Sequence, residues 1–71
     1  MRLEKFTEKA GNPVWIDSAS VDVIGTIYTD GTEVGDDPSA EPICYVVLKS
    51  GVTVHLDQSA EGVAKRLGFV G

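Results

Sequence analysis

Two side chains in this chain of 71 residues could act as a soft nucleophile or metal ligand, namely Cys44 and His55. A structural zinc ion takes four protein ligands and a catalytic one takes three, so this pair needs carboxylates or a second subunit to complete a site. Both residues lie in segments with strand-like alternation, and the register preferred below puts them on opposite faces of a sheet. We therefore expect a core cysteine, a surface histidine and no metal site.

The segment 29–42 concentrates negative charge. It holds two glycines, two prolines and five of the eleven carboxylates, which are Asp30, Glu33, Asp36, Asp37 and Glu41. Carboxylates bind Ca²⁺, but the order D-x-[DN]-x-[DN]-G that places oxygens around the ion is missing, and so is the G-x-x-x-x-G-K of a phosphate-binding loop. We expect a long, flexible, solvent-facing loop.

Hydroxyl groups near turns offer no nucleophile. Ser18, Ser20 and Ser59 have no basic partner close in the sequence, and capping or turn roles account for them. Asp17 and Asp22 could form a carboxylate pair across a turn, but turn chemistry explains them equally well. The sequence predicts no catalytic residue, no cofactor and a protein that is not an enzyme.

Residues 43–68 form the unit around which the chain is organised, two strands joined by a tight turn and followed by a short helix. Two arms rich in β-branched residues alternate with period two, which is typical of paired strands. A two-residue Ser50-Gly51 loop would put Tyr45 and Val47 on the same face as Val52. We prefer a three-residue loop with Gly51 in the left-handed conformation, because it gathers six apolar side chains on one face, namely Cys44, Val46, Leu48, Val52, Val54 and Leu56.

The opposite face then carries Tyr45, Val47, Lys49, Thr53 and His55. Uncovered aromatic and β-branched side chains suggest a protein contact. The candidate contact residues are Trp15, Tyr45, Val47 and His55. The competing interpretation, that an N-terminal hairpin covers these side chains within the chain, has equal weight.

A short helix is predicted after the second arm. Asp57 or Ser59 can accept its first free N–H groups, and Gly68 fits the position just past its end. The apolar residues at spacing i, i+3, i+4, i+7 form a stripe that faces the sheet, namely Ala60, Val63, Ala64 and Leu67.

An N-terminal hairpin is predicted from residues 2–7 and 14–17. We expect Leu3 and Phe6 to be buried in its first strand, and Trp15 in its second strand to be the largest single contributor to burial.

Residues 21–27 predict a third strand, with Val21, Val23, Gly25 and Ile27 on one face. The strand is apolar on both sides, so we expect it at the centre of the sheet. The fold class is therefore α+β: a small, mostly antiparallel sheet of about five strands (a β-meander) with one C-terminal helix packed on one face, forming a single domain over residues 1–71.

Composition limits the partners. The net charge of −5 and the six scattered basic residues disfavour nucleic acid and anionic membranes. A lone cysteine and no apolar run fit a cytoplasmic protein without a membrane segment. A core this small with five aromatic residues offsets the entropy of folding narrowly, so we expect self-association.

Three stretches resemble the small flagellar FlbD-type proteins of bacteria: IDSASVDVI at 16–24, VLKSG at 47–51 and DQSAEGV at 57–63. The three stretches span about two thirds of the chain, from residue 16 to residue 63, and the acidic segment 29–42 within that span departs from the family pattern. The resemblance implies a bacterial or phage accessory protein of β-rich fold with a final helix, and it supplies no catalytic residue.

The leading hypothesis for the function is a non-enzymatic interaction or oligomerisation module. The alternatives are a regulator linked to nucleic acid through protein contacts or acidic mimicry, and a ligand-binding or enzyme module with a site between subunits around His55 and Tyr45.

Overall fold

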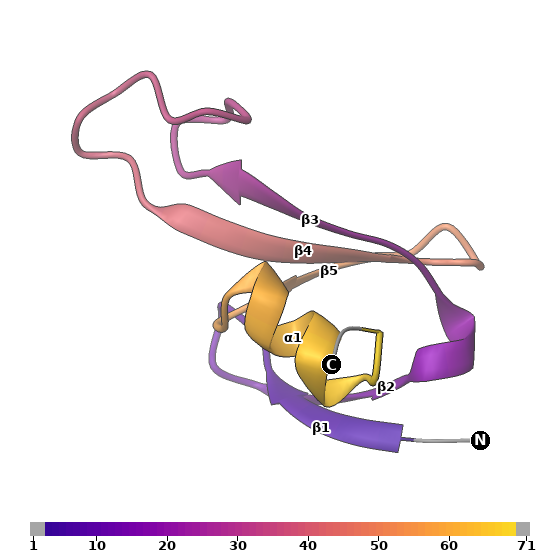
Figure 1. The fold of residues 1–71 in the computed structure, drawn as a ribbon. Coiled ribbons are helices and arrows are strands. Elements are labelled where there is room, and N and C mark those ends of the chain that lie inside the picture. Colours follow the sequence, from indigo (N-terminus) through magenta and orange to yellow (C-terminus); the bar gives the residue numbers. More distant parts are fainter. Residues whose placement is uncertain (1–2, 70–71) are drawn as a thin grey trace.

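The computed structural model describes residues 3–69, and these form five strands and one α-helix (Figure 1). The elements are β1 (Leu3–Thr7), β2 (Pro13–Asp17), a 3₁₀ turn (Ser18–Ser20), β3 (Val21–Tyr28), β4 (Pro42–Leu48), β5 (Thr53–Leu56) and α1 (Ala60–Arg66). The predicted α+β class and element order are confirmed. Residue 2, which we expected to begin the first strand, lies outside the described residues.

The five strands divide into two antiparallel sheets, a β1-β2 hairpin and a three-stranded sheet in the order β3-β4-β5. A bridge between Glu8 and Leu56 joins the two sheets. Beside it, the Lys9 N–H donates to the His55 carbonyl and the Asp57 N–H donates to the Thr7 carbonyl, both at 2.9 Å. The prediction that the third strand is central is wrong: the order β3-β4-β5 puts β4 at the centre of the three-stranded sheet and β3 at its edge.

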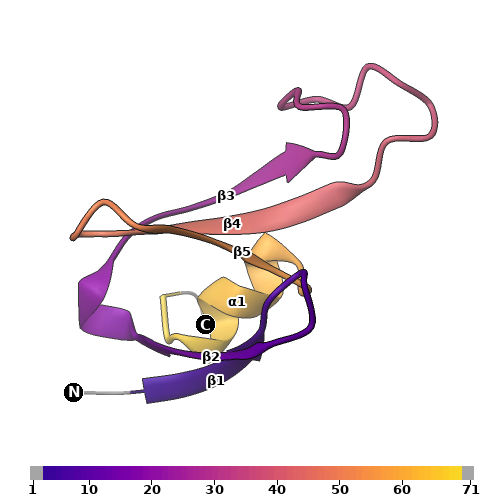
Figure 2. The ribbon, with the colours of Figure 1, turned by 180° about the vertical axis from the view of Figure 1, so that it is seen from behind.

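The hairpin and the helix lie on the same side of the three-stranded sheet, as Figures 1 and 2 show from opposite directions. Side chains from all three parts meet in one core, which contains Phe6, Ile16, Cys44, Val46, Val54, Leu56, Val63 and Leu67. The guanidinium of Arg66 lies 4.5 Å from the centre of the Phe6 ring and covers it. We call the sheet face that meets this core the inner face and the opposite one the outer face.

The β4-β5 hairpin has the preferred register. Val46 pairs with Val54 and Cys44 with Leu56, and Gly51 has φ +93° in a turn closed by the hydrogen bond from the Gly51 N–H to the Leu48 carbonyl. Of the six apolar residues expected on the inner face, Val52 is the one that does not pack into the core. It is 54% exposed because the turn extends past the hairpin and the helix (Figure 1).

Strand β3 contains a bulge at Asp22. Val21 pairs with Leu48, whereas Val23 pairs with Val47, so the strand gains one residue relative to its partner. A bulge reverses the alternation that follows it. Val21 and Ile24 therefore pack against the core, while Val23, Gly25 and Ile27 take the outer face. The expectation that Val21 shares a face with Val23 is wrong for this reason.

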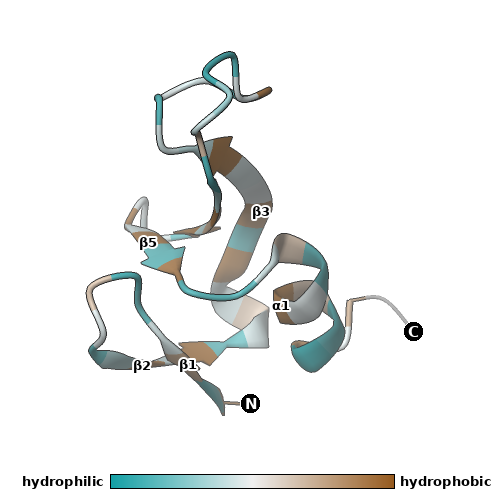
Figure 3. Ribbon diagram, turned by 90° about the vertical axis from the view of Figure 1, so that its left-hand side faces the viewer, coloured by the Kyte–Doolittle hydropathy of each residue, from teal (hydrophilic) through white to brown (hydrophobic). Residues whose placement is uncertain are grey.

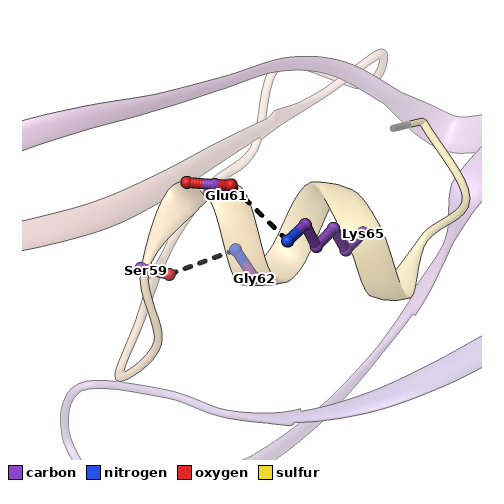
Figure 4. Close-up of polar contacts among 4 residues, drawn as sticks. All are labelled: Ser59, Glu61, Gly62 and Lys65. Carbon is purple, nitrogen blue, oxygen red and sulfur yellow. Dashed lines mark hydrogen bonds and ion pairs between the residues drawn. The ribbon is translucent and has the colours of Figure 1, made fainter. Parts of the chain in front are cut away.

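Helix α1 has a defined start and end. The Gly62 N–H donates to Ser59 Oγ at 3.1 Å, so Ser59 rather than Asp57 is the N-cap (Figure 4). Glu61 and Lys65 form an ion pair one turn apart, at 3.5 Å. At the other end, Gly68 has φ +87° and the Phe69 N–H donates to the Ala64 carbonyl, the arrangement of a Schellman motif. The predicted apolar stripe faces the core through Val63 and Leu67.

Of the three side chains expected to be buried in the N-terminal hairpin, Phe6 is buried and Leu3 and Trp15 are exposed. Ile16 is 2% exposed and Phe6 is equally buried, whereas Trp15 is 58% and Leu3 55% exposed. Neighbouring residues in a strand point to opposite faces, so Trp15 and Ile16 cannot both enter the core. Leu3 and Phe6 are three positions apart in the sequence, so they also point to opposite faces. The core accepts the Phe6 and Ile16 side, and Trp15 lies on the surface.

The burial of Ile16 and the exposure of Trp15 predict different losses of stability when each side chain is truncated. Ile16→Ala should lower the free energy of unfolding by about 2–5 kcal/mol because it leaves a cavity in the core. Trp15→Ala should change it by less than about 1 kcal/mol, because its ring is largely solvated. Urea denaturation followed by circular dichroism measures both, and a Trp15→Ala cost equal to that of Ile16→Ala contradicts the arrangement.

Candidate functional site: the outer face of the three-stranded sheet

The outer face is the largest part of the sheet that neither the hairpin nor the helix covers. Alternation along the strands places on it Val23, Gly25, Ile27, Ile43, Tyr45, Val47, Thr53 and His55. Val23 is 44% exposed, and Ile27, Tyr45 and Val47 are half-buried. Figure 3 shows apolar segments along the ribbon of β3. This face is therefore mostly apolar and aromatic.

The Tyr45 ring lies across strand β3 above Gly25. The two residues are register partners, and a Cβ atom added to Gly25 would lie 2.5 Å from both Cζ and the hydroxyl oxygen of Tyr45. Only a glycine lets the ring lie flat on the neighbouring strand, a pairing in which the aromatic side chain covers the exposed glycine backbone. The ring thereby fills the gap that Gly25 leaves in the outer face.

A hollow of about 230 Å³ lies beside that ring, lined by Ile27, Glu33, Tyr45, Val47, Thr53 and His55. Tyr45 and His55 are cross-strand partners, so the β4-β5 register places them together. Glu33 comes from the long loop and brings the one carboxylate among the residues that line the hollow. The sequence did not identify Glu33 as part of this site, because its position depends on how the loop folds and no spacing signal indicates it.

The structure brings together three of the four candidate contact residues. Tyr45, Val47 and His55 line the same hollow, while Trp15 lies on the outward side of the β1-β2 hairpin, where the Lys5 ammonium is 5.8 Å from its ring centre. The hairpin packs on the inner face through Phe6 and Ile16. The interpretation that this hairpin covers Tyr45 and Val47 is therefore wrong.

Side chains of the acidic loop form hydrogen bonds with other residues of the same loop. The carboxylate of Asp30 accepts hydrogen bonds from the N–H and hydroxyl of Thr32 and from the Asp37 N–H, at 2.7–2.9 Å. The Asp37 carboxylate in turn accepts from the N–H and hydroxyl of Ser39. The bonds to Asp30 stabilise its charged form and so lower the pKa of its carboxyl group below the usual value. The N–H of Asp37 contributes most to this lowering, and Thr32 contributes next. The network gives the segment that carries Glu33 a defined shape.

The remaining reactive side chains have structural positions. Cys44 is buried in the core, where desolvation raises the pKa of its thiol, and His55 is exposed on the opposite face, as expected. Asp17 accepts the Ala19 N–H at the start of the 3₁₀ turn. Within residues 3–69, no three His, Cys, Asp or Glu side chains are grouped as metal ligands. No helix in the same range is long and apolar enough to span a membrane.

The fold and this face define a small α+β domain with an uncovered, mostly apolar sheet surface. No family model, no curated protein and no solved structure matches the chain.

The contact between Gly25 and Tyr45 predicts a non-additive pair of substitutions. Gly25→Ala should destabilise the protein by about 1–3 kcal/mol, because the added methyl group displaces the Tyr45 ring. In a Tyr45→Ala background the same change should be neutral or stabilising, since alanine loses less backbone entropy than glycine. A double-mutant cycle by urea denaturation at low protein concentration measures the coupling, and equal costs in the two backgrounds contradict the contact.

The Asp30 network predicts a pH response of the loop. Because the folded-state pKa is lowered, the network is intact above the ordinary aspartate value of about 3.9 and is lost as the pH falls through the lower folded value. Carboxyl-carbon NMR of Asp30 should give a midpoint below 3.9, and Asp30→Asn should remove the matching transition from the Thr32 and Asp37 amides. A midpoint at or above 3.9 contradicts the network.

Proposed function

We propose that this protein is a non-enzymatic interaction module that associates with itself through the outer face of β3-β4-β5. The observation that carries this proposal is the uncovered surface of Val23, Ile27, Tyr45 and Val47, which face away from both the hairpin and the helix. Contiguous exposed apolar surface with aromatic residues is typical of protein contacts.

The small size of the core supports the same proposal. Eight residues are buried in the core of residues 3–69, and Cys44, the sole cysteine, has no disulfide partner. Domains of this length bury a small fraction of their surface, and association is one of the few remaining sources of stability. Burial of the outer face between two copies would extend the apolar core of each.

The resemblance to FlbD-type proteins suggests where such a module works. Its three stretches include the end of β2, the 3₁₀ turn, the start of β3, the β4-β5 turn and the beginning of α1. On that basis we propose an accessory protein of bacterial or phage origin that acts in the cytoplasm.

Two other functions rank lower. A regulator linked to nucleic acid would act through protein contacts, since the net charge of −5 opposes phosphate binding. A ligand site around Tyr45 and His55 gains the Glu33 carboxylate, but the hollow of about 230 Å³ is smaller than the 300–1,000 Å³ of ordinary ligand pockets.

Light scattering and sedimentation across a wide concentration range test self-association. The wild-type chain should form a species larger than the monomer, and Val23→Lys should weaken it about tenfold or more, because a charge would be buried in the contact. Leu3→Lys is the matched control, since Leu3 is similarly exposed but lies on the outward side of the hairpin.

A wild-type chain that stays monomeric at millimolar concentration contradicts the proposal. If Leu3→Lys disrupts the association and Val23→Lys does not, the contact lies on the side of Trp15, and the outer face of the three-stranded sheet is excluded.

A further inference from the structure

We propose, on the basis of the proposed function, that two copies stack their outer faces about a two-fold axis that runs across the strands. In this arrangement Lys49 of each copy enters the hollow of the other, next to Glu33. The occupant of the hollow is thus a lysine side chain from a second copy of this chain.

The outer face carries opposite charges at its two ends. Lys49 is the first residue of the turn that follows β4. Its N–H donates to the Ser20 carbonyl at 2.8 Å, next to the last pair of the β3-β4 ladder, so we place its side chain on the same side as those of Tyr45 and Val47, by the alternation of the strand that it extends. Glu33 lies toward the end from which the long loop projects, and the face between the two residues is apolar or neutral.

A two-fold axis across the strands brings these ends together. Such an axis stacks β4 of one copy on β4 of the other in the opposite direction, as in aligned sheet packing. With the axis near Val47, Val47 of one copy faces Val47 of the other. Tyr45 lies two residues before Val47 and Lys49 two residues after it, so Tyr45 of each copy faces Lys49 of the other. Each dimer therefore contains the lysine contact twice. An axis parallel to the strands would instead place Lys49 against Lys49.

The chemistry of the hollow suits an ammonium group. Glu33 supplies a carboxylate, and the Tyr45 ring supplies an aromatic surface of the kind that attracts cations. Neither Glu33 nor Lys49 forms an ion pair with another residue in the range 3–69. Pairing across the contact would supply each with an opposite charge and would fix the direction of stacking.

The size of the molecule is compatible with such a contact. A dimer of standard size buries about 800 Å² per partner, which is less than a fifth of the surface of 4476 Å².

Charge exchange tests the arrangement. Lys49→Glu and Glu33→Lys should each weaken the homodimer about tenfold or more at low salt, because each places like charges together twice. An equimolar mixture of the two variants should restore association, since one chain then carries two carboxylates and the other two ammonium groups at the facing positions. Native mass spectrometry and sedimentation distinguish the mixed dimer from both homodimers.

Two control variants carry the same charge changes elsewhere. Lys5→Glu lies on the outward side of the hairpin and Glu61→Lys on the exposed surface of α1. Each should leave the dimer within about twofold of the wild type, because exposed charges outside a contact affect affinity weakly. Circular dichroism checks that all four variants remain folded.

The outcomes separate this inference from the proposed function. If the wild type dimerises but Lys49→Glu weakens it no more than Lys5→Glu, or the mixture stays dissociated, the two-fold arrangement is overturned while self-association stands. If the wild type does not associate at all, the proposed function fails before any variant is compared. Preferential capture of the Lys49→Glu and Glu33→Lys pair as a mixed dimer supports the arrangement.

Discussion

The pairing of Val46 with Val54 is the constraint on which the rest of the structure depends. With these two side chains turned inward, Cys44 and Leu56 follow by alternation and form an apolar surface on the sheet. The hairpin and the helix add their own apolar residues to it. A slip of one residue on either arm would exchange its inner and outer sets, so a single register decides both what is buried and what is left for contact.

The parts of the fold that depend on local chemistry could be predicted from the sequence. A glycine turn fixed the β4-β5 register, and serine and glycine caps fixed the two ends of α1. The positions that depend on docking could not. Alternation allows only one of Trp15 and Ile16 to point into the core. The larger side chain, Trp15, was the residue expected there, but Ile16 is the buried one because it lies on the same side of the hairpin as Phe6. Likewise, β3 is apolar on both faces although it lies at an edge, and its bulge at Asp22 leaves no mark in the composition.

The outer face was predictable in part for the same reason. Tyr45, Val47 and His55 lie together because they belong to the one hairpin whose register the sequence specified. Two features came from more distant parts of the chain. Gly25 allows the Tyr45 ring to cross β3, and the hydrogen bonds of Asp30 shape the loop that carries Glu33. The acidic segment, which on composition resembles a solvated linker, thus contributes one wall of the candidate site.

The position of Cys44 has a practical consequence. Its sulfur is the sole thiol of the chain and lies beneath the helix and the hairpin, at 2% exposure. At this exposure, reaction with a thiol reagent depends on local opening of the core, whereas separation of two folded copies would leave the residue buried. The rate of thiol labelling therefore serves as a built-in indicator of domain opening that is insensitive to assembly. It offers a simple means of distinguishing a variant that has lost its partner from one that has lost its fold.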